Sequence, residues 1–424
     1  MSAAVDRVLA AADSLVDEAT AFACDLIRIP TVNPPGAHYD DCARRIGDTL
    51  ARFGGRVEYL VAEQRPEHTA AHPRVNVLGT WPGAGRGATI HLNGHIDVVP
   101  PGHGWSVDPF AGIVRDGFIW GRGAADMKAG LAAAVFAHEA VRRAGIGLAG
   151  TIEISGTVDE ESGGMAGVAW LAAQGRIASG RTDAVIIPEP LGADRICVGH
   201  RGVYWFEIET KGRIAHGSMP FHGVSAIDHM AVVLGRLRDV LQPRLARRTT
   251  AMPVLPPAAR HATLNINGIN GGQPVVGIQT PCVADACRAV FDRRFLLEEG
   301  FDAAKAEVVE LLESIRGELP DFDYHLRDLM IVHPTQTPED SPVIHAIDRA
   351  LHRVLGRSGG LIASPGTYDH KHVARIAGIP HCVAYGPGIL DLAHQPDEYC
   401  EIADLINATK VIALAILELT QTHG

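Results

Sequence analysis

The sequence predicts an α/β fold into which a smaller α+β module is inserted, and three observations support this. Short β-branched runs alternate with helical patterns over residues 1–202, as in a sheet layered with helices. Over residues 203–332 the predicted elements follow the order β-α-β-β-α-β, which describes a ferredoxin-like module. Residues 333–424 return to the α/β pattern. We therefore predict one α/β domain built from segments 1–202 and 333–424, with an inserted domain at 203–332.

Three predicted strands of the first segment lead directly into polar side chains. They are predicted at 89–92, 151–158 and 183–187, where β-branched residues are concentrated. His95 follows the first strand, the acids 159–161 follow the second, and Glu189 follows the third. Ligands of open α/β sheets gather at the carboxyl ends of strands. We therefore expect these side chains to share one site.

The remaining elements are predicted from hydrophobic spacing. Residues 203–210 (VYWFEIET) alternate like a strand with one wet face, and 225–241 place Ile227, Met230 and Val233 on one face of a helix. By the same criteria we predict helices at 129–142, 303–315 and 402–419 and strands at 262–269, 284–296 and 324–331. These elements complete the inserted module and the return to the main domain.

Composition excludes several classes of protein. The formal charge of −11 argues against a nucleic-acid partner, which would require a basic face. No apolar run reaches the roughly 18 residues of a membrane span, and the first 20 residues lack the basic start and apolar core of a signal peptide. The seven cysteines form no CxxC pair, so we expect reduced thiols and a cytoplasmic protein.

Five residues are candidate metal ligands, and each has an ordinary alternative explanation. His95 and Asp97 form an HxD pair, which by itself is more typical of a surface pair or a satisfied polar pair than of a metal site. Asp126, between a glycine-rich turn and a helix, is a possible N-cap. Glu161 belongs to the acids 159–161, which are costly together unless a cation or a proton offsets their repulsion, or which form a solvated loop. Glu189 and His394 lie in turns rich in proline and glycine.

The five residues together favour a metal site. Two imidazoles and three carboxylates suit zinc, manganese or cobalt better than calcium or magnesium. Such a set can hold two ions if one carboxylate bridges them. Glu160, next to a ligand, is the natural general base for a metal-activated water.

At this point the sequence resembles a known family, the co-catalytic metallohydrolases that include acetylornithine deacetylase, succinyl-diaminopimelate desuccinylase, aminoacylase-1 and carboxypeptidase G. The resemblance covers nearly the whole chain and keeps the family's order of motifs. The motifs are NGHIDVVPPG (93–102), WSVDPF (105–110), GRGAADMKAG (121–130), DEESGG (159–164), PEP (188–190), HRG (200–202), AHGSMP (215–220) and AHQPDEY (393–399). The resemblance implies a zinc-exopeptidase-like catalytic domain with a mixed central sheet, and an inserted domain that acts as a lid and dimerisation domain.

The resemblance also implies a role for each candidate. One ion is expected at His95, Asp126 and Glu189, and the second at Asp126, Glu161 and His394. Asp97 is expected to orient His95, and Glu160 to act as general base. His216, in the inserted domain, is expected to reach the site of a partner subunit in a homodimer and to stabilise the oxyanion. Zinc is the expected metal, manganese and cobalt are alternatives, and one of the two sites can be empty.

Candidate substrate contacts are less specific. Arg201 and Arg294 are candidates for binding a substrate carboxylate, although an internal pair with Asp292 explains Arg294 equally well. The segments 275–281 and 366–372 depart from the family pattern. The first segment has Gly277 or Gln279 near the position where many relatives have an asparagine that makes a polar contact to the substrate.

In the second segment, Asp369 keeps its place among Tyr368, His370, Lys371 and His372. We expect this loop to lie near the pocket and Asp369 to contact substrate, or else the loop to be a histidine-rich surface turn.

These expectations favour an enzyme that hydrolyses the amide C–N bond of an N-acyl amino acid or a related small, carboxylate-bearing substrate. The alternative is an aminohydrolase that releases ammonia from an unusual amine, such as an aminobenzoate, at the same metal site. A third hypothesis, a non-catalytic binding or scaffold protein, predicts the loss of a ligand or of the base, and none is lost. No nucleic-acid or membrane partner is expected.

Overall fold

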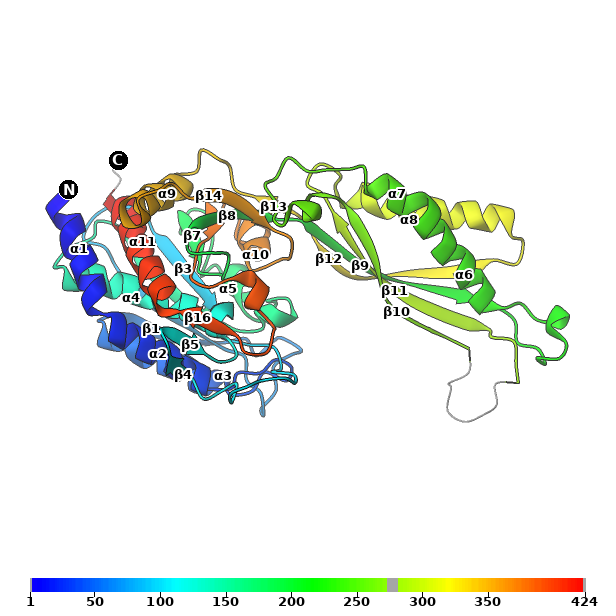
Figure 1. Ribbon diagram of the computed structural model, residues 1–424, viewed down its shortest axis with the longest axis horizontal. Coiled ribbons are helices and arrows are strands. Elements are labelled where there is room, and N and C mark those ends of the chain that lie inside the picture. The colour runs from blue at the N-terminus through cyan, green and yellow to red at the C-terminus, as the bar shows by residue number, and fades with distance from the viewer. Residues whose placement is uncertain (1, 273–280, 422–424) are drawn as a thin grey trace. The chain divides into compact units, whose positions relative to one another are not determined.

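The computed structural model describes residues 2–272 and 281–421 (Figure 1). The chain folds into two compact units. The first contains Met1–Gly199, Thr337–Ile362 and Tyr368–Gly424, and the second contains His200–Gln336 and Ala363–Thr367. Each unit is described below by itself.

The first unit contains, whole or in part, eight strands of a mixed sheet that has nine strands within the described residues. The strand order is β1-β2-β6-β3-β7-β15-β8-β13, with β14 also paired to β8. The bounds are β1 Arg56–Val61, β2 Val75–Trp81, β3 Ile90–His95, β6 Ile152–Thr157, β7 Ala184–Ile187, β8 Arg195–His200, β13 Thr335–Gln336, β14 Gly360–Ser364 and β15 Cys382–Ala384. Strand β3 is parallel to its neighbours β6 and β7, whereas β2 is antiparallel to its neighbours β1 and β6. The predicted α/β fold with a mixed central sheet is confirmed.

Helices surround this sheet, and apolar residues of α1, α2, α3, α4, α9 and α11 form the larger hydrophobic core with it. The helices of the unit are α1 Ser2–Ser14, α2 Val16–Arg28, α3 Tyr39–Arg52, α4 Ala129–Arg143, α5 Val168–Ala173, α9 Pro342–Leu355, α10 His370–Arg375 and α11 Ile402–Gln421. The ring of Phe136 on α4 contacts Phe22 on α2 and Phe53 at the end of α3. These three helices therefore share one layer. A small antiparallel sheet of β16 (Tyr399–Glu401), β5 (Phe118–Trp120) and β4 (Ile113–Arg115) completes the unit.

Strand β3 carries apolar residues on one face and polar residues on the other, although both faces are buried. Gly94 faces α4, because a Cβ atom there would lie 3.1 Å from Leu131. Side chains alternate along a strand, so His91, Asn93 and His95 point to the opposite face. One face of β3 therefore carries a row of polar side chains that leads to the carboxyl end of the strand, where the parallel strands β6 and β7 also end.

The second unit has the element order β9, α6, β10, β11, α8, β12. Its four strands lie in the order β12-β9-β11-β10, and all neighbours are antiparallel. The bounds are β9 Gly202–Lys211, α6 Ala226–Arg236, η4 Leu237–Leu241, α7 Gln242–Leu245, β10 Thr263–Gly271, β11 Ala286–Phe295, α8 Phe301–Glu318 and β12 Asp323–Val332. The predicted helix at 225–241 is thus α6 continued by the π-helical turn η4. Apolar residues of α6, α8 and the sheet form a core separate from that of the first unit.

The second unit also includes residues 363–367, which the sequence did not indicate. Val254 forms a parallel bridge with Ala363, and the backbone of Ala363 donates to Pro253 and accepts from Leu255. The proline-rich segment near 253–257 therefore binds this stretch of chain. Within the described residues, no helix is long and apolar enough to cross a membrane.

Candidate metal centre

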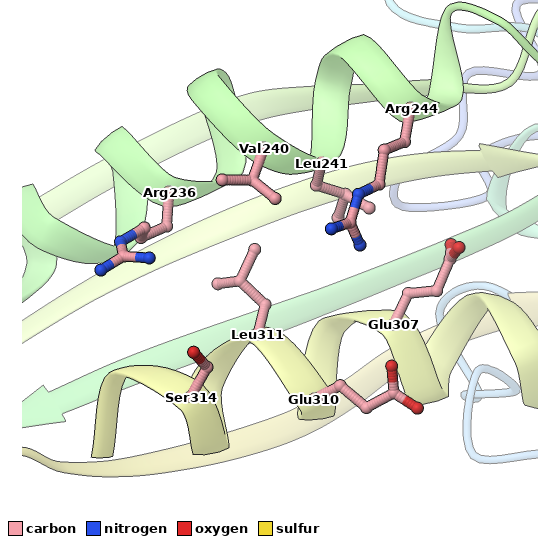
Figure 2. Close-up of a pocket in the computed structure, with 8 residues that line it drawn as sticks. All are labelled: Arg236, Val240, Leu241, Arg244, Glu307, Glu310, Leu311 and Ser314. Atoms are coloured by element: carbon pink, nitrogen blue, oxygen red, sulfur yellow. The ribbon is translucent and has the colours of Figure 1, made fainter. Parts of the chain in front are cut away.

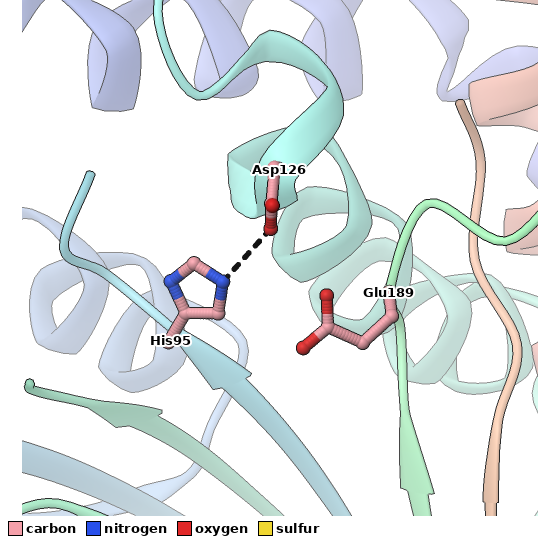
Figure 3. Close-up of side chains that lie close together, drawn as sticks. All are labelled: His95, Asp126 and Glu189. Atoms are coloured by element: carbon pink, nitrogen blue, oxygen red, sulfur yellow. Dashed lines mark hydrogen bonds and ion pairs between the residues drawn. The ribbon is translucent and has the colours of Figure 1, made fainter. Parts of the chain in front are cut away.

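The five predicted ligands, drawn from five separate segments, come together in two groups of three. His95, Asp126 and Glu189 form one group, shown in Figure 3, and Asp126, Glu161 and His394 form the other. In each group the candidate ligand atoms lie within 4.8 Å of one another. Asp126 belongs to both groups, so it lies where a bridging carboxylate would lie.

The carboxylate of Asp126 lies between two imidazole rings. Its Oδ1 is 3.0 Å from Nε2 of His95, and its Oδ2 is 3.5 Å from Nε2 of His394. Asp126 lies in the π-helical turn η1 (Ala124–Lys128) that precedes α4. The N-cap position of α4 is Lys128, without a side-chain cap, so the N-cap explanation of Asp126 is wrong.

The turn that carries Asp126 is held by a buried ion pair between Arg122 and Glu398, which the sequence did not indicate. Glu398 accepts hydrogen bonds from the backbone N–H groups of Ala125 (2.8 Å) and Asp126 (3.0 Å). Arg122 donates to the other oxygen of Glu398 at 2.6 Å, and both side chains are buried. Glu398 and Arg122 lie in the motifs at 393–399 and 121–130, but their types alone did not indicate that they pair.

Replacing Glu398 with alanine should destabilise the protein and lower its metal content. The change leaves Arg122 charged and buried without its partner, which typically costs about 3–5 kcal/mol in the free energy of unfolding. It also frees the backbone that positions Asp126. Denaturant unfolding and metal analysis would measure both effects, with the exposed Glu401→Ala as control. Full metal content and unchanged stability would contradict this role.

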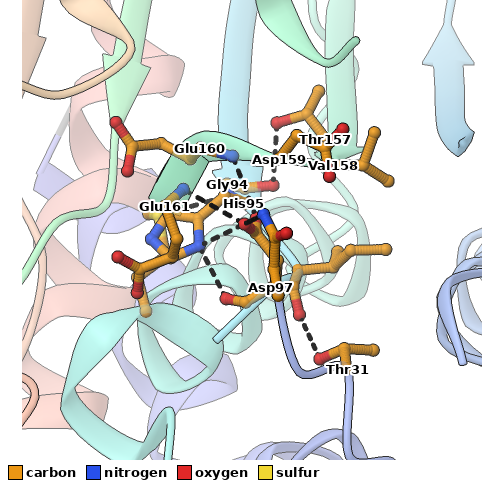
Figure 4. A network of polar contacts seen from close by, with 12 residues as sticks. Thr31, Gly94, His95, Asp97, Thr157, Val158, Asp159, Glu160 and Glu161 are labelled. Carbon is orange, nitrogen blue, oxygen red and sulfur yellow. Dashed lines mark hydrogen bonds and ion pairs between the residues drawn. The ribbon is translucent and has the colours of Figure 1, made fainter. Parts of the chain in front are cut away.

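Asp97 is the centre of a buried network beside the ligands (Figure 4). Its carboxylate accepts from the backbone N–H groups of Glu160 and Glu161, each at 3.1 Å, and from Asn33 Nδ2 at 3.0 Å. Burial alone would raise the pKa of Asp97, but hydrogen bonds from His95, Asn33 and the backbone of Glu161 outweigh it and lower the pKa. Asp97 therefore stays ionised and anchors the turn that carries the acids 160 and 161.

Asp97 also contacts His95 through two groups. The Nδ1 atom of His95 lies 2.9 Å from the backbone oxygen of Asp97 and 3.6 Å from its Oδ1. A proton on Nδ1 leaves Nε2, which faces Asp126, with the lone pair that a metal requires. The backbone carbonyl is the closer partner of this ring nitrogen, and the Asp97 carboxylate, for which we predicted the orienting role, lies farther away.

The electrostatics of the site fit bound cations. Burial, followed by the charge of Asp126, raises the pKa of Glu189 well above its ordinary value. Burial is also the main cause that raises the pKa of Glu161 to about 7. Hydrogen bonds to Asp126 and Glu161 raise the pKa of His394 to about 10. Buried carboxylates that lie close together and retain protons near neutral pH are suited to a divalent cation, because the cation would stabilise their ionised form.

Metal binding should therefore release protons. In the metal-free protein His394 is protonated at neutral pH, because its pKa is about 10, and it must lose that proton to ligate. Zinc affinity should weaken by about tenfold per pH unit for each proton displaced as the pH falls from about 8 to about 6. Competition titrations with a chromophoric chelator would measure this slope. A dissociation constant that does not change over this range would exclude His394 as a ligand.

Glu160 follows β6 in the short 3-10 helix η2 (Glu160–Ser162), with 11% of its side chain exposed. Its Oε1 accepts from Lys371 Nζ at 2.9 Å. Lys371 belongs to the atypical segment 366–372, in which we predicted a substrate contact only for Asp369. Asp369 is buried and accepts from Asn93 Nδ2 at 3.0 Å.

The three other candidates, His216, Arg201 and Arg294, lie in the second unit. Arg294 makes a two-pronged pair with Asp292, at 2.7 and 2.9 Å, which is the alternative that the sequence left open. Arg201 is buried and donates to the backbone oxygens of His261 and Pro365. His216 is exposed. Gly277 and Gln279 lie outside the described residues.

A pocket of about 150 Å³ also lies in the second unit, between α6–α7 and α8 (Figure 2). Its lining includes the charged residues Arg236, Arg244 and Glu307 and the apolar residues Leu241 and Leu311. It is lined by none of the candidate metal ligands. It is therefore a feature of this helical layer and not part of the metal centre.

Known proteins support the assignment of this chain. Residues 91–418 match the model of peptidase family M20/M25/M40. The chain is 30% identical to succinyl-diaminopimelate desuccinylase from Xylella fastidiosa over 94% of this chain and 98% of that protein. It is 28% identical to N-formyl-4-amino-5-aminomethyl-2-methylpyrimidine deformylase from Halalkalibacterium halodurans over 98% of this chain and 97% of that protein.

Solved structures show the same fold. A dipeptidase from Saccharomyces cerevisiae has a TM-score of 0.77 at 18% identity, with 100% of both chains covered. A dinuclear metal-binding peptidase of family M20 from Bacillus subtilis has a TM-score of 0.69 at 16% identity, covering 97% of this chain and 100% of that one. The predicted resemblance is confirmed: the chain belongs to peptidase family M20/M25/M40 and is a metal-dependent hydrolase that acts on C–N bonds.

Proposed function

We propose that this protein hydrolyses the amide C–N bond of an N-acyl amino acid or a related small substrate. The observation that carries the proposal is the pair of ligand groups that share Asp126, with Glu160 on the turn beside Glu161. An amide hydrolase of this type needs a cation site, a base next to it and a fixed distance between them. Asp97 supports this arrangement because it binds the backbone of both glutamates.

We propose His95, Asp126 and Glu189 as ligands of one divalent ion, and Asp126, Glu161 and His394 as ligands of a second. Two imidazoles and three carboxylates suit zinc, with manganese or cobalt as alternatives. When bound, such ions supply Lewis-acid chemistry, polarising a carbonyl group and making a water more acidic.

Glu160 is the proposed general base. Its carboxylate accepts a proton from the attacking water and returns it to the nitrogen of the leaving amine, so its net protonation is unchanged after one cycle. Its position next to Glu161 places it beside the ion site without making it a ligand of either group.

His216 is the proposed oxyanion donor, acting across a homodimer. Its Nδ1 accepts from the backbone N–H of Ser218 at 3.1 Å, so the neutral ring carries its proton on Nε2 and can donate there. Edge strands β10 and β12 expose Ile266, Ile269 and Leu329, which supports an interface between copies through this unit. A monomer by light scattering after gel filtration would contradict the dimer.

Substrate specificity would be tested with a panel of N-succinyl, N-formyl and N-acetyl amino acids, dipeptides and aryl amines. The acyl groups follow the names of the relatives, which act on a succinyl and a formyl amide. The protein would be stripped with a chelator, reloaded with zinc or manganese, and assayed for free carboxylic acid, amine and ammonia.

Equal release of acid and amine supports the proposal. Ammonia without a carboxylic acid product would instead establish the aminohydrolase alternative. No turnover of any member of the panel with either metal would overturn amide hydrolysis of this substrate class.

A further inference from the structure

In the atypical segment 366–372, the buried Lys371 forms an ion pair with Glu160, the proposed general base. Lys371 Nζ lies 2.9 Å from Glu160 Oε1, and only 7% of the lysine side chain and 11% of the glutamate side chain are exposed. A buried ammonium is costly unless it is paired, so a lysine here needs its carboxylate partner. The pair joins residues 211 positions apart in the sequence.

Two neighbours of Lys371 hold it in place: His372, on α10, and Asp369, just before α10. His372 Nε2 lies 2.7 Å from the backbone oxygen of Gly163, in the turn that follows Glu160. Asp369 packs against the same turn, since a Cβ atom on Gly164 would lie 2.7 Å from its Oδ1. Asn93 holds the other oxygen of Asp369. The start of α10 is therefore docked on the turn at several points, and the ammonium has a defined position.

The charges around Lys371 keep it protonated. Burial by itself would lower the pKa of Lys371, but the carboxylates of Glu160, Asp369 and Glu189 outweigh burial and raise the pKa. The ammonium thus places a fixed positive charge on the side of Glu160. The hydrogen bond from Lys371 to Glu160 Oε1 restricts the rotation of the Glu160 carboxylate.

We propose that Lys371 is a positioning residue that holds the carboxylate of Glu160 in its working orientation. This inference rests on the proposed function, in which Glu160 is the base. Lys371 acts through Glu160 and does not itself exchange a proton with the substrate or bind it. The segment 366–372, which departs from the family pattern, then serves to align the base and is not a surface turn.

The central variants are Lys371→Met, which keeps an unbranched side chain one atom shorter and removes its charge, and Lys371→Arg, which keeps the charge. The matched control is Arg375→Met, which removes a cation from an exposed position of the same helix. Each protein would be loaded with manganese, checked for metal content and thermal unfolding, and assayed with the best substrate of the panel.

Lys371→Met is expected to lower kcat by about 10²-fold with little change in KM or metal content, because a misaligned base loses most of its contribution. Lys371→Arg should recover most of that loss, and Arg375→Met should behave like the parent protein. In a Glu160→Gln background the Lys371→Met change should have no further effect, since the lysine acts through the missing carboxylate. A rise in KM at unchanged kcat would overturn the proposal and identify Lys371 as a substrate-binding residue.

A crystal structure of manganese-loaded Lys371→Met provides a measurement that does not depend on turnover. The proposal expects the Glu160 carboxylate to occupy a different or mixed orientation, and an unmoved carboxylate would overturn it. If the parent protein is inactive on the panel, the proposed function fails and the crystal structure still decides the role of Lys371. If Glu160→Gln is inactive but Lys371→Met keeps its kcat, the inference about Lys371 alone fails.

Discussion

Replacing Glu160 with glutamine is expected to lower kcat by about 10²–10⁴-fold while both metal ions remain bound. The amide has nearly the shape of the carboxylate but cannot accept a proton. Glu160 belongs to neither ligand group, so the ions should not depend on it. Its backbone N–H, which Asp97 binds, is unchanged by the substitution.

The neighbouring Glu161→Gln provides the internal contrast. Glu161 lies 3.0 Å from Nε2 of His394 and belongs to the second ligand group, so its replacement should remove metal as well as activity. Exposed Glu63→Gln controls for the loss of one charge. Metal analysis and steady-state kinetics on the three variants separate the two roles. Substantial activity in Glu160→Gln would show that another group takes the proton.

Replacing Asp126 with alanine should remove both ions and reduce activity to background. Asp126 is shared between the two ligand groups, with one oxygen facing His95 and the other facing His394. Its loss leaves two protein ligands in each group, too few for a tight site. The two imidazoles would also lose their closest shared acceptor.

His394→Ala is the matched comparison, because His394 belongs to the second group alone. It should lose one ion and retain the other at His95, Asp126 and Glu189. Metal stoichiometry after gel filtration, with zinc and with manganese, measures the difference. If Asp126→Ala retained one ion with unchanged affinity, then Asp126 would not be a bridge and the two groups would be independent.

Much of the fold follows from local pattern. The predicted strands at 151–158 and 183–187 correspond to β6 and β7, and the predicted helix at 303–315 corresponds to α8, with ends shifted by a few residues. Alternation and helical spacing are properties of neighbouring residues, so one sequence carries them. The boundary at 363–367 could not be predicted, because it depends on a bridge between Val254 and Ala363 that lie far apart in the chain.

The five candidate metal ligands illustrate the same division. The sequence by itself determined the family, the α/β class and the identity of five candidate ligands, because motifs keep these residues in order. Only the tertiary structure decided how the side chains meet. It placed Asp126 between two imidazoles, Glu398 beneath the turn of Asp126, and Lys371 against Glu160. Such contacts depend on how elements pack, and residue type and spacing do not encode packing between segments hundreds of positions apart.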